Sequence, residues 1–147
     1  MTGPAPASLP DWAPGTVAVL ATGAGAPHAI PVSTAVRTGP RTIALALALR
    51  RESLARLRAD ARCALTIVTD GDVAFTAHGR ATIEAEPMTV SDRVAALRID
   101  VETIQDHADE RFVIDAGVRW HWTDDDAEHQ DASIRAALAS ATTGGMR

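Results

Sequence analysis

Hydrophobic and polar residues alternate along short stretches of this chain, and the clearest alternation runs from Thr42 to Leu49. Isoleucine or leucine occupies every second position of this stretch, and alanine occupies most of the positions between them. A two-residue period places the large side chains on one face of a strand and the alanines on the other. Because both faces are apolar, we expect this strand to be buried on both sides, although alanine alone is a poor strand former.

Other stretches have the same strand-like pattern, and residues typical of turns separate them. They are Gly15–Thr22, His28–Val36, Arg62–Thr69 and Val73–Glu84. The dipeptide Asp70-Gly71, between the last two, is the strongest hairpin signal in the chain. Gly79 lies inside the last stretch, where a glycine is expected to mark a β-bulge.

The second half of the chain has less uniform patterns. Val94–Ile104 fits either a helix or a strand with one solvent-facing side, and we favour the strand. Phe112–Trp122 is expected to form a hairpin around the turn sequence DAG. Helical spacing predicts a short helix over Arg51–Asp60 and a final short helix that begins at Asp131 or Ser133 and carries Ile134 and Leu138. The tally is about seven strands, one short helix after the third strand and one C-terminal helix.

Length and composition place the chain among globular proteins with one domain. We treat residues 1–147 as that domain, with a loose arm at 1–10 and a tail at 142–147. No apolar run approaches the ~20 residues of a membrane-spanning helix, and the first ten residues do not have the features of a secretory signal. The single cysteine, Cys63, excludes an internal disulfide, so we expect a cytoplasmic protein.

The charges form a basic segment and an acidic segment. All 14 basic residues are arginines, many of them between Arg37 and Arg62, whereas acidic residues predominate from Asp100 onward. The formal net charge of −5 argues against a general nucleic-acid-binding protein. The arginine cluster is either a solvated surface or, in part, a binding site for a phosphate group, and charge alone does not decide between these two interpretations.

Many short antiparallel strands with close turns predict a mainly β protein that forms a small barrel or a sandwich. The order of the elements from Gly15 to Glu84 resembles the pyridoxamine 5′-phosphate oxidase-like, FMN-binding split-barrel family. The stretches that carry the resemblance are GTVAVLAT, PHAIPVS, TIALALAL, RRESLARLRADARCALTIV and AHGRATI. They stand in the places of the family's strands and of its short helix, so the resemblance implies a split β-barrel.

The same resemblance implies a homodimer with a flavin in each groove between the subunits. FMN is the expected cofactor, and a deazaflavin is the alternative. Carried over residue by residue, the backbone that would contact the flavin ring belongs to Ala29, Ile30, Pro31, Val32 and Ser33. The residues that would surround the ribityl chain and the phosphate are Leu47, Arg50, Arg51 and Ser53, with Arg56 in a supporting position. The longer acidic tail of a deazaflavin would use further arginines, namely Arg37, Arg41 and Arg58.

The start of the predicted helix is physically suited to bind a phosphate group. A helix N-terminus presents unpaired N–H groups and the positive end of the helix dipole. Arg50 and Arg51 precede the first turn, and a guanidinium group can bind two phosphate oxygens at once. The hydroxyl group of Ser53 adds a further hydrogen-bond donor, so these side chains are candidate phosphate ligands.

A few other residues are candidates for chemistry. His28 either contacts the flavin or has a structural role, whereas His78 and Cys63 are expected to be structural. Trp120 and Trp122 share one face of the predicted strand; they fill the core or the dimer interface, or leave one ring beside the ligand groove. The acidic run between His121 and His129 is expected to cap the final helix rather than to bind a metal.

The sequence thus predicts an FMN-binding oxidoreductase that acts on an unknown small molecule. In such a protein the cofactor supplies the redox chemistry, and the chain supplies binding, orientation and electrostatics. A deazaflavin-dependent reductase of the same fold is one alternative. A non-catalytic, ligand-binding barrel dimer is the other, and it is favoured by Glu52 beside the predicted phosphate site and by the lack of lysine.

Overall fold

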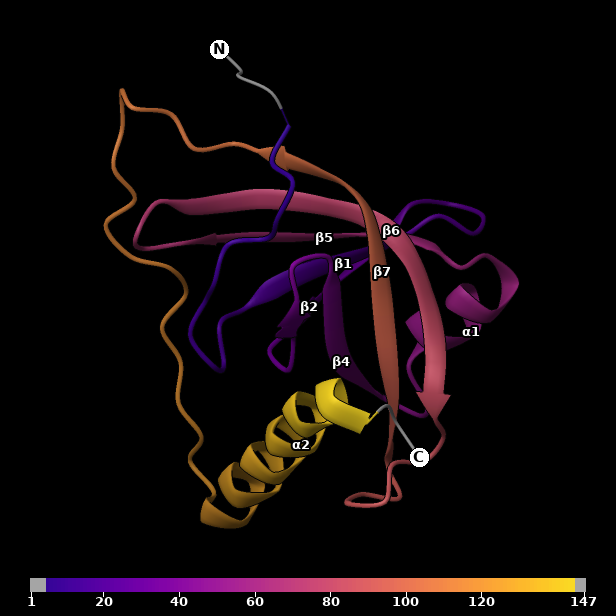
Figure 1. Cartoon of the computed structure of the whole chain (residues 1–147). Coiled ribbons are helices and arrows are strands. Elements are labelled where there is room, and N and C mark those ends of the chain that lie inside the picture. Colours follow the sequence, from indigo (N-terminus) through magenta and orange to yellow (C-terminus); the bar gives the residue numbers. More distant parts are fainter. Residues whose placement is uncertain (1–4, 145–147) are drawn as a thin grey trace.

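The computed structural model describes residues 5–144, which form seven strands and two helices (Figure 1). The strands are β1 (Ala18–Thr22), β2 (His28–Val32), β3 (Val36–Gly39), β4 (Thr42–Ala48), β5 (Arg62–Thr69), β6 (Val73–Ala85) and β7 (Val94–Asp106). The helices are α1 (Glu52–Ala59) and α2 (Asp125–Gly144). Neither of these helices combines the length and the hydropathy that crossing a membrane requires.

All seven strands belong to one antiparallel sheet with the order β2-β1-β5-β6-β7-β4-β3. The long strands β6 and β7 bend across the molecule, so that the sheet coils on itself (Figure 1). The two end strands, β2 and β3, follow each other in the chain, and no ladder joins them within the described residues. The sheet is therefore a barrel with an open seam between β2 and β3, which confirms the predicted mainly β split barrel.

Two details of the strand predictions are confirmed by the ladders. Val94–Asp106 is a strand, as its alternating pattern favoured. The ladder between β6 and β7 shifts register at His78 and Gly79, so the predicted bulge is present. A Cβ atom on Gly79 would lie only 2.2 Å from the carbonyl oxygen of Asp100, which explains why this position needs glycine.

Two predicted β elements are wrong. The single strand expected over His28–Val36 is divided into β2 and β3 by residues 33–35. The hairpin expected over Phe112–Trp122 does not form. Residues 107–124, which we call the strap, contain no strand; they run as an extended connection from the end of β7 to the start of α2 (Figure 1).

The strap is attached to the barrel instead of folding back on itself. The amide of Ile114 donates a hydrogen bond to the carboxylate of Asp72 (2.9 Å), and the indole N–H of Trp120 donates to the carbonyl of Gly15 (2.9 Å). A Cβ atom on Gly117 would lie 2.4 Å from the hydroxyl oxygen of Thr69. Gly117 therefore permits a close approach to the β5–β6 hairpin, and its presence does not signal a turn.

Helix α2 begins earlier than predicted. Its first turn contains Asp125, Asp126 and Glu128, whose carboxylates interact favourably with the positive end of the helix dipole. The expected start at Asp131 or Ser133 is therefore wrong, although Ile134 and Leu138 are buried as expected. Residues 142–144 of the predicted tail belong to α2, and residues 145–147 lie outside the described residues.

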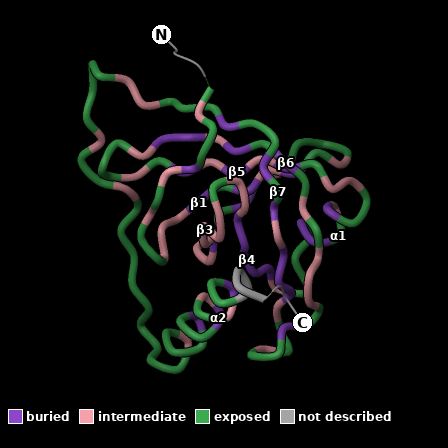
Figure 2. The backbone as a smooth tube through the Cα atoms, in the orientation of Figure 1, coloured by how far each residue is buried: buried purple, intermediate pink, exposed green. Residues whose placement is uncertain are grey.

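The barrel interior forms the main core, and Figure 2 marks the buried residues in purple. The N-terminal segment contributes to this core, contrary to the expectation of a loose arm. Leu9 is buried, and its amide donates a hydrogen bond to the carbonyl of Pro40 (2.8 Å). The indole N–H of Trp12 donates to the carbonyl of Ala35 (2.9 Å), and its ring packs against Phe75. Residues 1–4 of the predicted arm lie outside the described residues.

Candidate functional site

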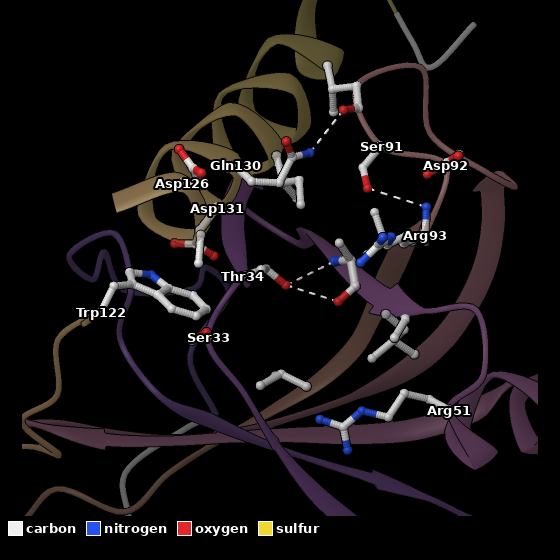
Figure 3. A pocket seen from close by; sticks show the side chains of 18 of the residues that line it. Ser33, Thr34, Arg51, Ser91, Asp92, Arg93, Trp122, Asp126, Gln130 and Asp131 are labelled. Carbon is white, nitrogen blue, oxygen red and sulfur yellow. Dashed lines mark hydrogen bonds between the residues drawn. The ribbon is translucent and has the colours of Figure 1, made fainter. Parts of the chain in front are cut away.

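A cavity of about 950 Å³ lies at the seam between β2 and β3. Its walls come from residues 31–34, from residues 46–48 of β4, from the loop 89–94 between β6 and β7, and from α2 with the end of the strap. Figure 3 shows Arg51 and Arg93 on one side of this space and Trp122 and Asp131 on the other. Its volume lies in the upper part of the range of about 300–1,000 Å³ that is typical of small-molecule sites.

Thr34 ends the ladder between β3 and β4 beside this cavity. Its hydroxyl group donates a hydrogen bond to the carbonyl oxygen of Ala46 (3.1 Å) and accepts one from the amide of the same residue (3.0 Å). Buried backbone groups need such partners, and here one side chain satisfies both of them. The backbone of Ser33 and Thr34 can therefore leave β4 without exposing unpaired groups.

The small side chains of β4 allow α2 to cover the outer face of the sheet. Ala44 and Ala46 pack against Ile134 and Leu138 of α2 and against Met88, while the larger residues of β4 face the barrel interior. The prediction that this strand is buried on both sides is thereby confirmed. Alanine suits the outer face because the helix has to lie close to the strand.

The start of α1 presents one of the predicted phosphate ligands to the cavity and buries another. Arg51 occupies the N-cap position and lines the cavity (Figure 3). Ser53 is fully buried, and its hydroxyl oxygen lies 3.2 Å from Nε2 of His28. Ser53 therefore attaches α1 to β2 and is absent from the cavity lining. The same contact gives His28 the structural role that was one of its two expected roles.

Arg56 is held by structural contacts rather than facing the cavity. Its Nε donates to the carboxylate of Glu52 (2.7 Å), and its guanidinium group also donates to the carbonyls of Ala24 and Ala26. The hydrogen bond from Arg56 and its positive charge lower the pKa of Glu52. The negative charge that the sequence places beside the predicted phosphate site is thus paired within α1.

The cavity therefore brings together only part of the predicted cofactor residues. Those that line it are Pro31, Val32, Ser33, Leu47 and Arg51. Those that do not line it are Ala29, Ile30, Arg50, Ser53 and Arg56. Ala29 and Ile30 precede the lining residues on β2, and Arg50 is exposed to solvent beside Arg51.

Arg51 and Arg93 are unusual among the arginines of this chain. Most of the others donate hydrogen bonds or form ion pairs, whereas the side chains of these two have no partner within residues 5–144. They come from different elements and line the same cavity. Two unpaired guanidinium groups at one cavity form a suitable site for an anion such as a phosphate group.

The opposite wall of the cavity contains residues that the sequence analysis did not place there. The side-chain amide of Gln130 donates to the carbonyl of Val90 (2.9 Å), which ties α2 to the loop that carries Arg93. Asp126 and Asp131 add carboxylates on the α2 side (Figure 3). No local motif marks these positions, because distant segments come together only in the folded chain.

Trp122 also lines the cavity, and it packs edge-to-face on Trp120 with 5.4 Å between the ring centroids. Both rings are more than one-third exposed, so they do not fill the core, and their expected place in a dimer interface stays a prediction. The alternative prediction, one ring beside the ligand groove, agrees with the position of Trp122.

The arginines expected to bind a longer acidic tail are engaged elsewhere. Arg37 donates to the carbonyl of Leu9, and Arg41 donates to the carbonyls of Ala7 and Val101. Arg58 pairs with the carboxylate of Glu86. None of the three arginines lines the cavity.

The remaining candidates have structural surroundings. The carboxylate of Asp124 accepts a hydrogen bond from the amide of Asp126 (3.3 Å), as a helix cap does. Within the part of the chain that the structure describes, no three His, Cys, Asp or Glu residues are grouped to hold a metal ion. His78 is hydrogen-bonded to Gln105 (3.1 Å). Cys63 is buried, and burial raises the pKa of its thiol to about 12, which makes it unreactive.

No protein-family model matches this sequence, and no curated protein matches it either. Several solved structures resemble its fold. HupZ from Group A Streptococcus has a TM-score of 0.54 and 16% identity, over 71% of this chain and 90% of that chain. A candidate pyridoxamine 5′-phosphate oxidase from Lactobacillus delbrueckii has a TM-score of 0.53 and 15% identity, over 60% and 83% of the two chains. The flavin reductase PheA2 has a TM-score of 0.50 and 12% identity, over 62% and 78%. At such identities the likeness concerns the fold alone.

Proposed function

From the split-barrel fold that this chain shares with pyridoxamine 5′-phosphate oxidase-like proteins, we propose that it is a flavin-binding oxidoreductase that holds FMN in the cavity at the seam. One observation carries the proposal: Arg51 and Arg93, both without a partner in the described chain, line the same cavity as Pro31–Ser33. FMN combines a flat, largely apolar ring with a phosphate group. It therefore needs an apolar wall and an anion site within one cavity.

The residues present fit this cofactor at both of its ends. Pro31 and Leu47 offer an apolar wall for the ring. Arg51 adds its charge to the positive end of the α1 dipole, where phosphate groups bind well. Arg93 approaches the same space from the β6–β7 loop. In this proposal Arg93 binds the phosphate group in place of Ser53, the ligand that the family resemblance implied.

A bound flavin would supply the transfer of electrons or hydride. The chain itself binds the phosphate through the two guanidinium groups and keeps water from the ring with its apolar wall. Helix α2 borders the remaining space, which is where a small-molecule substrate would enter. FMN is favoured over a deazaflavin because Arg37, Arg41 and Arg58 already have protein partners. We further propose that the protein is a cytoplasmic homodimer.

The first test is the visible absorption spectrum of the purified protein, followed by titration of the colourless protein with FMN and with a deazaflavin. Arg51→Ala and Arg93→Ala should each weaken FMN binding at least tenfold, or about 1.4 kcal/mol. Arg50→Ala is the matched control, because Arg50 has the same chemistry but does not line the cavity. The affinity of this variant for FMN should stay within twofold of that of the unaltered protein. Equal effects of Arg50→Ala and Arg51→Ala would contradict the phosphate site. If the protein binds neither flavin, the remaining hypothesis is the non-catalytic, ligand-binding barrel dimer.

A further inference from the structure

The strap is an extended segment with no strand beside it. From Asp115 to Thr123 no backbone group is hydrogen-bonded to another backbone group within residues 5–144. The strap runs along the outside of the molecule, where nearly all of it is exposed (Figures 1 and 2). Extended segments with unpaired N–H and C=O groups are templates for pairing with another chain.

The side chains of the strap also resemble those of a strand. Phenylalanine, valine, isoleucine and tryptophan, which favour strands, recur from Phe112 to Trp122. Val113 is 72% exposed and Val118 is 67% exposed, although large apolar residues usually find cover in a folded chain. The hairpin predicted for this segment fails within one copy, yet its strand-forming residues remain without a partner strand.

Two oppositely charged residues of the strap lie symmetrically around Gly117. Asp115 precedes this glycine by two residues, and Arg119 follows it by two residues. Neither side chain has a hydrogen-bond or ion-pair partner within the described chain. Such an arrangement is self-complementary: two antiparallel copies that cross at Gly117 place each aspartate opposite an arginine.

We propose that the strap pairs as an antiparallel β-strand with the strap of a second copy, centred on Gly117. In this register Asp115 of each copy faces Arg119 of the other, and Ile114 faces Trp120. A two-fold symmetric dimer uses the same patch on both subunits, as this pairing requires. The proposal specifies the surface of the homodimer proposed above and rests on that dimer, but it does not depend on flavin binding.

A second copy is the partner that the charges favour. The chain has a net charge of −5, so two copies repel each other unless their contact pairs opposite charges. The strap provides one such pair on each side of its centre, and the acidic residues Glu110 and Asp124 face each other only at its two ends. The same register places Phe112 of one copy opposite Trp122 of the other, and Trp122 lines the cavity. The second copy would thus border the proposed ligand site.

Charge reversal gives a direct test by light scattering and sedimentation over a range of concentrations. Asp115→Arg alone and Arg119→Asp alone each place like charges opposite each other twice in the dimer. Each variant should therefore raise the dimer dissociation constant at least tenfold. An equimolar mixture of the two variants should restore association to within about threefold of the unaltered protein, because both cross-strand pairs then carry opposite charges.

Arg111→Asp is the matched control, because it makes the same charge change on the same strap but faces Thr123 in this register. Its dissociation constant should stay within threefold, and thermal unfolding of all variants should confirm that they fold. Dimers that are insensitive to both single reversals, or a mixture that stays monomeric, would overturn the strap pairing while leaving homodimerisation itself intact. An unaltered protein that is monomeric at micromolar concentration would overturn both.

Discussion

The hydroxyl group of Thr34 pairs with both backbone groups of Ala46, so a side chain takes the place of the next residue in the β3–β4 ladder. The strand can stop at this point without leaving a buried N–H or C=O group unpaired. The consequence concerns the site as well as the fold, since Thr34 itself and the residues just before it line the cavity.

Thr34→Val should test this relationship, because valine keeps the shape of threonine but cannot form hydrogen bonds. Both polar groups of Ala46 would lose their partner, and we expect the free energy of unfolding to fall by about 1–3 kcal/mol. Urea unfolding measures this change. Thr89→Val is the matched control, because Thr89 lines the same cavity, is exposed and has no side-chain partner in the described chain; its effect should stay within about 0.5 kcal/mol. Equal effects of the two substitutions would contradict the role of Thr34.

Gly79→Ala should damage the β6–β7 ladder. The added Cβ would meet the carbonyl oxygen of Asp100 at 2.2 Å, and backbone on both strands would have to move. We expect a loss of at least ~2 kcal/mol in the free energy of unfolding. Gly23→Ala is the comparison, because the nearest atom to its Cβ is a carboxylate oxygen of Asp60 at 3.8 Å. A loss at Gly79 no larger than that at Gly23 would show that the bulge tolerates a side chain.

These features differ in how far the sequence could predict them. The bulge at Gly79 and the strand over Thr42–Ala48 follow from local patterns, since a glycine within a strand and a two-residue period each have few structural explanations. The strap could not be predicted from a local pattern. A glycine after Asp115 is typical of a turn, and only the folded structure shows that Gly117 is needed for the close approach to Thr69.

The residues of the candidate site, too, could be predicted only in part from the sequence. The family resemblance led to Pro31–Ser33, Leu47 and Arg51, which do line one cavity. It could not show that Ser53 is held by His28, because that contact joins residues far apart in the chain. Arg93 had no signal at all, since its importance depends on the loop that brings it to the cavity.

Asp60 should account for part of the acid sensitivity of the fold. Hydrogen bonds from the side chain and the amide of Arg62 lower its pKa from 3.8 to about 2. A carboxyl group whose pKa is lower in the folded state stabilises the fold above its unfolded pKa, and this contribution is lost as the pH falls from about 4 to about 2. The difference in Tm between the unaltered protein and Asp60→Asn should therefore be largest above pH 4 and shrink towards pH 2. Asp92→Asn is the control, because Asp92 is exposed and has no side-chain partner in the described chain, and this substitution should change the Tm little.

Trp122 should contribute to ligand affinity through its aromatic ring. It is the aromatic side chain in the cavity lining, and it stands opposite Arg51 and Arg93 (Figure 3). If FMN occupies this space, Trp122→Ala should raise its dissociation constant about fivefold, because an aromatic contact of roughly 1 kcal/mol is lost. Titration followed by flavin fluorescence measures this change directly.

The control for Trp122 is Trp12→Phe, which alters a tryptophan that packs on Phe75 and lies outside the cavity lining. This substitution removes the hydrogen bond to the carbonyl of Ala35 and should lower stability, but the affinity for FMN should stay within twofold. The two variants thus separate a loss of ligand contact from a loss of folding. An unchanged FMN affinity in Trp122→Ala, in a protein that still loses affinity in Arg51→Ala, would mean that the flavin lies against β2 and β4 without reaching the strap. The α2 side of the cavity would then be free for the substrate alone.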